Sequence, residues 1–249
     1  IKPTAPILAL LGDICCCGSN DDFTVFKRFI KEVEPLYEKI ILIAGNHEYY
    51  YNPDQKSSTI EYGNTLQGIN DKIHKFFKDT STKLHFLNNS SLNIITKKDT
   101  YLIVGSTLWS WIPEDQRDRI QKSMNDYQYV NVSDGKKIRK ITASDIANMH
   151  LKNYKYIRSQ LNKAKKTGKK VIVFTHHKPY ISESYNPNEL DPAYESDLSM
   201  LLVPPIVLWG YGHTHVADNS IQGKTWLFSN PKGYPNQKTN YNKSINIKI

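Results

Sequence analysis

Four short segments of the chain carry side chains that bind divalent metal ions, and each follows an apolar run. They are Gly-Asp at 12–13, Gly-Asn-His-Glu at 45–48, Thr-His-His at 175–177 and Gly-His-Thr-His at 212–215. Imidazole nitrogens and carboxylate or carboxamide oxygens suit zinc, manganese and iron without a thiolate. A carboxylate can bridge two ions, and two ions can hold the attacking and leaving oxygens of a phosphoryl displacement. The four segments therefore indicate metal-dependent chemistry.

Buried strands are expected to position these segments. Apolar runs precede them at 7–11, 40–44, 171–174 and 206–209, and such runs between polar loops are typical of buried strands. Because ligands gather outside the carboxyl ends of strands in sheets fed by crossover helices, we expect the segments to meet. Helices are predicted from the capping pair Asp21-Asp22 to Val33, at 59–77 and at 142–166, and further strands at 84–87, 92–95, 101–104, 225–228 and 244–249.

The composition is that of a globular protein. The chain has 249 residues, of which 39% are hydrophobic and 23% charged, so it can bury a substantial core. We expect a single domain over 1–249, with a polar, cap-like insertion around 110–141. The net charge of +9 is spread out, with modest concentrations at 136–140 and 163–170, and solvated lysines are favoured over a surface for an anionic partner.

Membrane insertion and secretion are not indicated. No apolar run approaches the roughly 20 residues that cross a bilayer, and the first residues lack a charged segment followed by a long apolar core. We therefore expect a cytoplasmic protein with no membrane partner. The chain begins with Ile, which favours a native protein with additional residues upstream.

The chain's three cysteines are consecutive, at Cys15, Cys16 and Cys17. Adjacent cysteines rarely meet the geometry of a disulfide, and a tetrahedral zinc site draws pairs from separated segments. We predict that they fill the turn between the first strand and the first helix. Oxidation or an intermolecular crosslink is the alternative.

Taken together, the motifs resemble those of the calcineurin-like metallophosphoesterases. The family signature runs Asp-x-His, Gly-Asp, Gly-Asn-His-Glu/Asp, a lone His after a strand, and Gly-His-x-His, and the last four occur here in order over nearly the whole chain. Each is weak alone, because a Gly-Asp or Gly-Asn pair after a strand is most often a turn. The segment SNPKGYP at 229–235 is similar to the tail of one branch of the family. The resemblance implies an α/β fold, a two-sheet αββα sandwich with helices on the outer faces.

The resemblance also implies a ligand set for two metal ions. Asp13 would be the bridging carboxylate, while Asn46, His176 and His213 would complete the second metal site. His215 would belong to the first site. The ions would be manganese, iron, zinc or magnesium, since the ligands tolerate several of them.

Next to His176 stands His177, and the residue types alone do not separate the two. The family places the ligand directly after the strand and its threonine, which favours His176.

Catalytic roles follow from the same resemblance. A metal-activated hydroxide would be the nucleophile, and His47 would be the general acid that protonates the leaving oxygen, with Glu48 beside it as an orienting partner. Tyr49, Tyr50 and Tyr211 are predicted to line the substrate site. Half-buried packing at a loop is an equally good interpretation of these tyrosines.

The first motif of the family is missing. Neither Asp nor His precedes Asp13, and no Asp-x-His occurs elsewhere in the sequence, so the first metal would keep only Asp13 and His215. Either the native protein has an N-terminal segment that this chain lacks, along with the first strand of the sandwich, or the protein dispenses with one metal. We favour the first explanation.

Three functions are compatible with these features. The first is hydrolysis of phosphate mono- or diesters, with a phosphorylated small molecule or protein as substrate. The second is a catalytically impaired scaffold of the same fold that binds a protein partner. A nuclease ranks third, because the basic residues lack the clustered, aromatic-interleaved pattern of a nucleic-acid groove. The substrate and the oligomeric state are left open, since specificity is expected to reside in 110–140 and 182–197.

The missing motif predicts the metal stoichiometry. The second site keeps all four protein ligands and the first keeps two, so the 249-residue chain should hold at most one divalent ion tightly. Elemental analysis of protein dialysed after loading with manganese should give about one equivalent or less. Two retained equivalents per chain would contradict this expectation.

Overall fold

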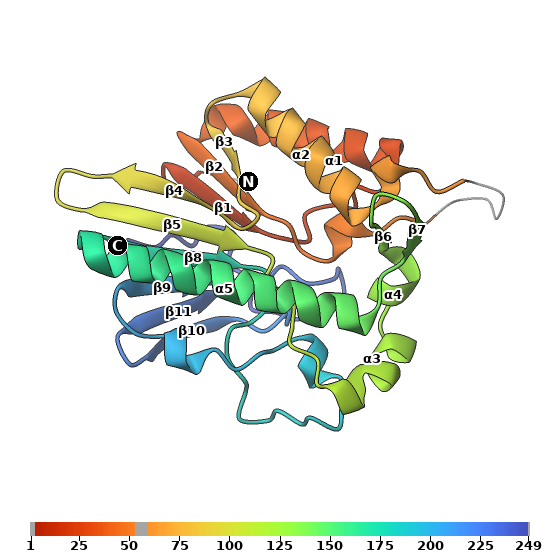
Figure 1. The fold of residues 1–249 in the computed structure, drawn as a ribbon. Helices are drawn as coiled ribbons and strands as arrows, with labels where there is room; N and C mark the ends of the chain where they lie inside the picture. Colours follow the sequence, from red (N-terminus) through yellow and green to blue (C-terminus); the bar gives the residue numbers. More distant parts are fainter. Residues whose placement is uncertain (1–2, 53–58, 249) are drawn as a thin grey trace. The chain divides into compact units, whose positions relative to one another are not determined.

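The computed structural model describes residues 3–52 and 59–248, which fall into two compact units (Figure 1). Unit 1 comprises 1–86, 118–143 and 243–249, and unit 2 comprises 87–117 and 144–242. Each unit has a sheet of its own and is described by itself. The single domain predicted over 1–249 concerns the assembly of the two units and stays a prediction.

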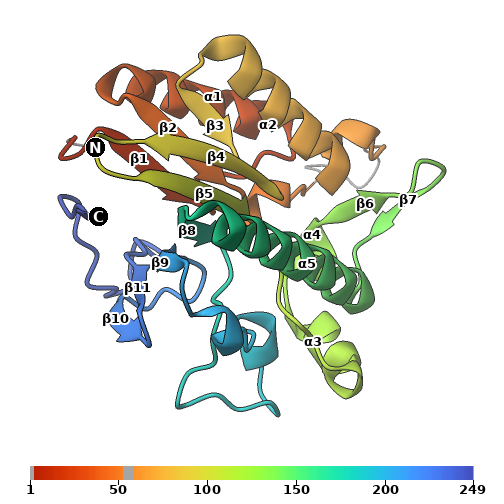
Figure 2. The same cartoon turned by 60° about the vertical axis from the view of Figure 1, so that its left-hand side comes forward.

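Unit 1 is built on a three-stranded parallel sheet. Its strands are β1 (Ile7–Leu11), β2 (Lys39–Ile43) and β3 (Leu84–Phe86), in the order β1-β2-β3. Helices α1 (Asn20–Val33) and α2 (Leu66–Thr80) lie side by side along the sheet (Figures 1 and 2). Phe26 and Phe77, one from each helix, stack with ring centroids 6.3 Å apart. This apolar layer holds the helices on strands whose ends carry the first two motifs.

Side-chain caps fix where the two helices begin. Ser19 accepts a hydrogen bond from the backbone N–H of Asp22 at the start of α1. Thr65 does the same for Gly68 at the start of α2. Such caps satisfy backbone donors that have no partner within the helix. The predicted helix at 59–77 therefore begins later than expected, at Leu66, and it follows a short 3₁₀ turn.

The chain returns to unit 1 with a group of short elements. They are α3 (Arg117–Ser123), α4 (Asp126–Tyr129), β6 (Asn131–Ser133) and β7 (Ile138–Lys140), the last two forming an antiparallel hairpin. Isolated bridges pair Tyr50 with Val130 and Thr65 with Asn131. Val130 and Asn131 of the predicted cap-like insertion thus pair with residues that follow the second motif. Its role as a cap stays a prediction.

Unit 2 contains a six-stranded mixed sheet in the order β10-β11-β9-β8-β5-β4. The strands are β4 (Ser90–Ile95), β5 (Thr100–Ser106), β8 (Lys170–Thr175), β9 (Ile206–Gly210), β10 (Asp218–Gln222) and β11 (Thr225–Ser229). The four inner strands are parallel, and β4 and β10 are antiparallel edges. The predicted hairpin at 92–104 is confirmed. Because β8 and β9 are parallel neighbours, the third and fourth motifs leave the same edge of the sheet.

One long helix covers this sheet. Helix α5 (Ala143–Thr167) lies along β5 and β8 (Figure 2), and its Ile157 and Leu161 are buried with Val104 and Val173 in one apolar cluster. Short 3₁₀ helices complete the two units: η1 (Glu34–Leu36), η2 (His47–Tyr49), η3 (Tyr62–Asn64), η4 (Glu114–Gln116), η5 (Asp191–Ala193) and η6 (Ser199–Leu201). Among the described helices, none combines the length and apolarity needed to cross a membrane.

One strand prediction was wrong, and three strands were not predicted: β6 and β7, within the expected insertion, and β10. Residues 244–248 form no strand, and residue 249 lies outside the described part. Strand β10 was not predicted, because its sequence DNSIQ is largely polar and its outward residues are exposed at a sheet edge. An edge strand carries little apolar signal, so periodicity alone could not find it.

Trp209 provides a test of how the apolar core of unit 2 supports the third motif, Thr175–His177. It is fully buried on β9, and its Nε1–H donates to Thr175 Oγ1 at 3.0 Å, directly before His176. Replacing Trp209 by Phe should lower the free energy of unfolding of the protein by about 2 kcal/mol, through lost packing and a lost buried hydrogen bond. Urea unfolding followed by circular dichroism measures this.

The matched control is Trp226→Phe on the neighbouring strand. Trp226 is partly exposed and its Nε1–H donates to Asn219 in an exposed pair at 2.7 Å. We expect a change below about 0.5 kcal/mol. Equal losses in the two variants would contradict the role given to Trp209.

Candidate functional site

Asp13 stands in a tight turn at the end of β1. Gly12 and Asp13 both have positive φ values, 93° and 58°, and a non-glycine residue in this region is sterically disfavoured. The turn brings the Asp13 Oδ1 atom 3.0 Å from the backbone N of His47, which donates to it. The first two motifs are therefore joined directly within unit 1.

Glu48 joins the same two motifs more extensively. Its carboxylate is fully buried and accepts hydrogen bonds from the backbone N–H groups of Asp13 (2.8 Å), Ile14 (2.6 Å) and Gly45 (2.6 Å). Hydrogen bonds from N–H groups to an ionised acceptor are the strong ones. The carboxylate thus holds the backbone of both loops. This contact set indicates a structural role for Glu48 beyond the predicted orientation of His47.

Asn46 is oriented by a residue that sequence analysis missed. Its Nδ2 donates to Asp126 Oδ1 at 2.9 Å and lies 3.2 Å from the Tyr50 hydroxyl. Asp126, on α4, is buried, and burial raises the pKa of its carboxyl while the bond from Asn46 opposes that rise. Because the Asn46 amide nitrogen is hydrogen-bonded to Asp126, the amide oxygen points away from Asp126. That orientation suits a metal ligand.

The His47 ring is held flat against Tyr50. Their centroids are 4.4 Å apart at an interplanar angle of 23°, and Tyr50 in turn contacts Tyr129 at 5.4 Å. Tyr49 points elsewhere: it is 1% exposed, and its hydroxyl donates to Asn70 at 2.8 Å. The position of Tyr49 differs from the substrate-lining one predicted, because its ring fills the interior of unit 1.

In unit 2, His176 and His213 place one nitrogen each at a common point. His176 Nε2 and His213 Nδ1 are 3.1 Å apart, which is hydrogen-bond distance without an ion, and the two residues follow β8 and β9. Two nitrogens bound at about 2.1 Å to one tetrahedral ion stand roughly 3.4 Å apart. The pair therefore has the spacing of two ligands of one ion.

His177 is oriented by a backbone carbonyl group. Its Nδ1 lies 3.2 Å from the carbonyl oxygen of Thr107 and so donates to it, and its ring contacts those of Trp109 at 5.4 Å and His213 at 4.2 Å. The Thr107 carbonyl also accepts the backbone N–H groups of His176 and His177. This geometry supports the choice of His176 as the ligand and makes His177 part of its support.

His215 is oriented by the tail of the chain. Its Nδ1 is 2.7 Å from Gln237 Oε1, and its ring contacts Tyr234 edge-on at 4.9 Å. A carbonyl acceptor on Nδ1 requires a proton there, which leaves Nε2 as the ligand atom. The Gln237 side chain therefore fixes the tautomer and the ring orientation of His215, as hydrogen-bond acceptors commonly do for metal-binding histidines.

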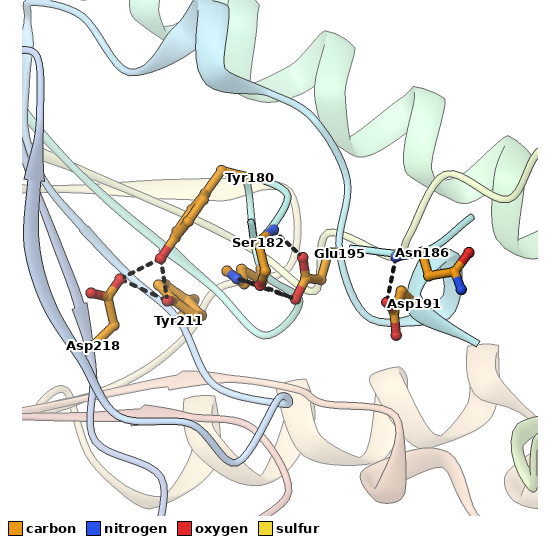
Figure 3. Close-up of polar contacts among 8 residues, drawn as sticks. Tyr180, Ser182, Asn186, Asp191, Glu195, Tyr211 and Asp218 are labelled. Atoms are coloured by element: carbon orange, nitrogen blue, oxygen red, sulfur yellow. Dashed lines mark hydrogen bonds and ion pairs between the residues drawn. The ribbon is translucent and has the colours of Figure 1, made fainter. Parts of the chain in front are cut away.

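The segment at 182–197, expected to influence specificity, is anchored at its base. Glu195 Oε1 accepts from Lys178 Nζ at 3.2 Å, and its Oε2 accepts the backbone N–H of Ser182 at 2.6 Å (Figure 3). Lys178 also bonds the Ser182 hydroxyl. Next to Glu195, the ring of Tyr194 stacks on His213 with centroids 4.9 Å apart. The anchored loop thus places the Tyr194 ring against the predicted ligand His213.

Tyr211 differs from its prediction in the same way as Tyr49. It is 3% exposed, and its hydroxyl donates to Asp218 at 2.7 Å. Burial and the neighbouring hydrogen bonds raise the pKa of this phenol. Tyr211 is therefore a buried structural donor, and of the three predicted tyrosines only Tyr50 is half-exposed.

The three cysteines occupy the turn between β1 and α1, as predicted. All are free thiols; Cys17 is buried and the other two are half-buried. Burial, with the Asp22 carboxylate nearby, raises the pKa of Cys16 to about 11. A protonated thiol is a poor nucleophile and a poor metal ligand. The raised pKa values favour the protonated thiols near neutral pH, and oxidation or an intermolecular crosslink stays the alternative.

Sequence analysis missed three residues that support the predicted ligands: Asp126, Thr107 and Gln237. None lies in a motif, and Asp126 is 80 residues from the amide it orients. An acidic residue amid the aromatic stretch 124–129 is the one signal that could have drawn attention to Asp126. Thr107 acts through its backbone carbonyl, so its side chain carries no signal.

Comparison with known proteins identifies the family. The family model described as calcineurin-like phosphoesterase matches residues 1–217, and the chain belongs to this family of metal-dependent phosphoester hydrolases. The predicted membership and the mixed α/β fold are confirmed.

Two relatives are informative. Uncharacterized protein L509 of Acanthamoeba polyphaga mimivirus is 33% identical over 252 residues, covering 97% of this chain and 83% of that protein. The crystal structure of phosphopantetheinyl hydrolase from Mycobacterium tuberculosis superposes with a TM-score of 0.69 at 14% identity, covering 94% of this chain and 82% of that one. The second likeness shows a shared fold.

The hydrogen bonds of Glu48 predict that replacing its carboxylate by an amide will destabilise the protein substantially. Glu48→Gln places an amide NH₂ where backbone N–H groups now donate to a carboxylate, so at least one donor loses its acceptor. We expect the free energy of unfolding to fall by about 3 kcal/mol. Glu38→Gln, at an exposed position in the same unit, should change it by less than about 0.5 kcal/mol. Comparable urea midpoints for the two variants would refute the assignment.

Proposed function

We propose that this protein hydrolyses phosphate mono- or diesters with the help of divalent metal ions. Family membership supports a metal-dependent phosphoester hydrolase. The single observation that carries the proposal for this chain is the pair His176 Nε2 and His213 Nδ1, 3.1 Å apart. That spacing suits two ligands of one ion, as argued above, and the ion would supply positive charge for phosphoryl oxygens and lower the pKa of a water molecule.

The proposed ligands are those implied by the resemblance: Asp13, Asn46, His176, His213 and His215. Each has support within its own unit. The Asn46 amide is oriented by Asp126, and His215 by Gln237. Nitrogen and oxygen donors without thiolates suit manganese, iron, zinc or magnesium.

His47 is proposed to protonate the leaving oxygen of the ester. Its backbone N–H is tied to Asp13 at 3.0 Å, and its ring is stacked on Tyr50 at 4.4 Å. A fixed ring costs less ordering during the reaction than a mobile one. Glu48 is proposed as a positioning residue, since its carboxylate holds the backbone on either side of Asp13 and before His47.

Substrate selection is proposed to reside in the loops. Tyr50 in unit 1 and Tyr194 in unit 2 are half-exposed aromatic residues beside a predicted functional histidine. Aromatic rings could contact the organic part of a phosphorylated small molecule or of a protein side chain. A cytoplasmic location accompanies this proposal as a prediction from the sequence.

The alternative function is a scaffold of this fold with impaired chemistry that binds a protein. Its support is that no Asp-x-His occurs within residues 1–249. A nuclease remains the third candidate and has no specific contact in its favour.

Replacement of His47 by Ala tests the proposed acid. General-acid catalysis contributes about 10²–10⁴-fold, so kcat should fall by that factor while bound metal stays unchanged. The loss should be larger for an alkyl phosphodiester than for bis(p-nitrophenyl) phosphate, because nitrophenolate leaves without protonation. Steady-state kinetics with manganese and elemental analysis provide the two readouts.

The matched control is His74→Ala, which removes an exposed imidazole from α2 in the same unit. It should retain full activity. Equal losses on both esters in the His47 variant would remove it from proton transfer. A wild-type protein that binds manganese but hydrolyses neither ester would favour the scaffold.

A further inference from the structure

The loop that carries His213 and His215 is strained. It connects β9 to β10, and both histidines have left-handed backbones, with φ of 65° and 55°. L-residues other than glycine rarely adopt this conformation, and they keep it only where the surroundings fix it. Something must therefore hold the segment 211–218 in place.

The two ends of this loop are tied by one carboxylate. Asp218, the first residue of β10, accepts through Oδ2 from the Tyr211 hydroxyl at 2.7 Å and from the Tyr180 hydroxyl at 2.9 Å (Figure 3). Tyr211 directly precedes Gly212 and His213. The bond from Tyr211 to Asp218 thus closes the loop across its base.

The second tyrosine ties in the other ligand loop. Tyr180 lies four residues after His176, and its hydroxyl is 3.3 Å from that of Tyr211. A backbone hydrogen bond of 3.0 Å runs from Gly212 N to His176 O between the same loops. One carboxylate oxygen therefore links the segment that carries His176 to the segment that carries His213.

We infer that Asp218 is a positioning residue for the histidine ligands of unit 2, acting through Tyr180 and Tyr211. Ionised acceptors make hydrogen bonds roughly twice as strong as neutral ones, and the carboxylate bonds both phenols at once. Loss of the bonds would let the strained loop relax and move His213 and His215 away from their ligand positions. The inference rests on the proposed metal-binding function of these histidines.

The experiment measures metal affinity directly, with Co²⁺ as the probe in isothermal titration calorimetry and in visible absorption. Asp218→Asn should weaken Co²⁺ binding about 10-fold, as is common for residues that orient metal ligands. Tyr180→Phe should weaken it less, because the bond from Tyr211 to Asp218 remains. The Tyr180 variant keeps the test decisive if the Asp218 variant does not fold.

Asp99→Asn is the matched control. Asp99 is also a carboxylate of unit 2 that accepts from a tyrosine hydroxyl, that of Tyr101 at 3.5 Å, and from Lys170 Nζ at 2.8 Å. It lies before β5 and beside the start of β8, whereas His176 follows the end of β8, so its replacement should change the Co²⁺ affinity less than about 2-fold, within the range of a surface substitution.

A double-mutant cycle separates positioning from general loop stability. If Asp218 acts through the two phenols, Asp218→Asn should cause little further weakening in a Tyr180→Phe/Tyr211→Phe background. Unchanged affinity in Asp218→Asn, an equal loss in Asp99→Asn, or full additivity in the cycle would overturn the inference. Co²⁺ binding that responds as expected, without ester hydrolysis, would contradict only the proposed function, whereas an unaltered chain that binds no Co²⁺ would contradict both.

Discussion

A buried carboxylate that accepts backbone N–H groups organises the functional part of unit 1. Glu48 receives such bonds from Asp13 in the first motif, from Ile14 directly after it, and from Gly45 at the start of the second motif. Without the Glu48 carboxylate, the loops that follow β1 and β2 would contain several buried backbone N–H groups and no common acceptor for them. Burial of those donors would then cost free energy instead of stabilising the turn. The position of Asp13 depends on this one group, and the Asp13 carboxylate in turn accepts the backbone N–H of His47.

In unit 2, several separate hydrogen bonds hold the loops that follow the strands. The Thr107 carbonyl supports His176 and His177, Gln237 supports His215, and Asp218 ties the loop that carries His213 and His215. The predicted ligands in both units are therefore held by acceptors on other segments. Ligand orientation by a second layer of hydrogen bonds is what allows a site to keep its geometry without strain in the side chains.

The strands that precede the proposed ligands could be predicted because buried parallel strands are continuous apolar runs, and the polar residues at their ends break the pattern. The runs before Asp13, Asn46, His176 and His213 are such strands. The supporting residues could not be predicted, because their partners are remote in sequence: Asp126 lies 80 residues from Asn46. Tyr49 and Tyr211 were expected to face a substrate, but an amphipathic ring packs equally well in a core when its hydroxyl finds an acceptor. Only coordinates distinguish the two positions.

The left-handed backbone at Asp13, His213 and His215 bears on how the protein would respond to selection for stability. Each such residue costs about 1 kcal/mol or more relative to a glycine in the same conformation. Because most proteins are selected only to remain above a stability threshold, this cost persists where the side chain is useful. A laboratory screen that rewards thermal resistance alone would favour glycine at these three positions. Glycine would relieve the backbone strain at these positions, but it would also remove the Asp13 bond to His47 and three of the five proposed ligands.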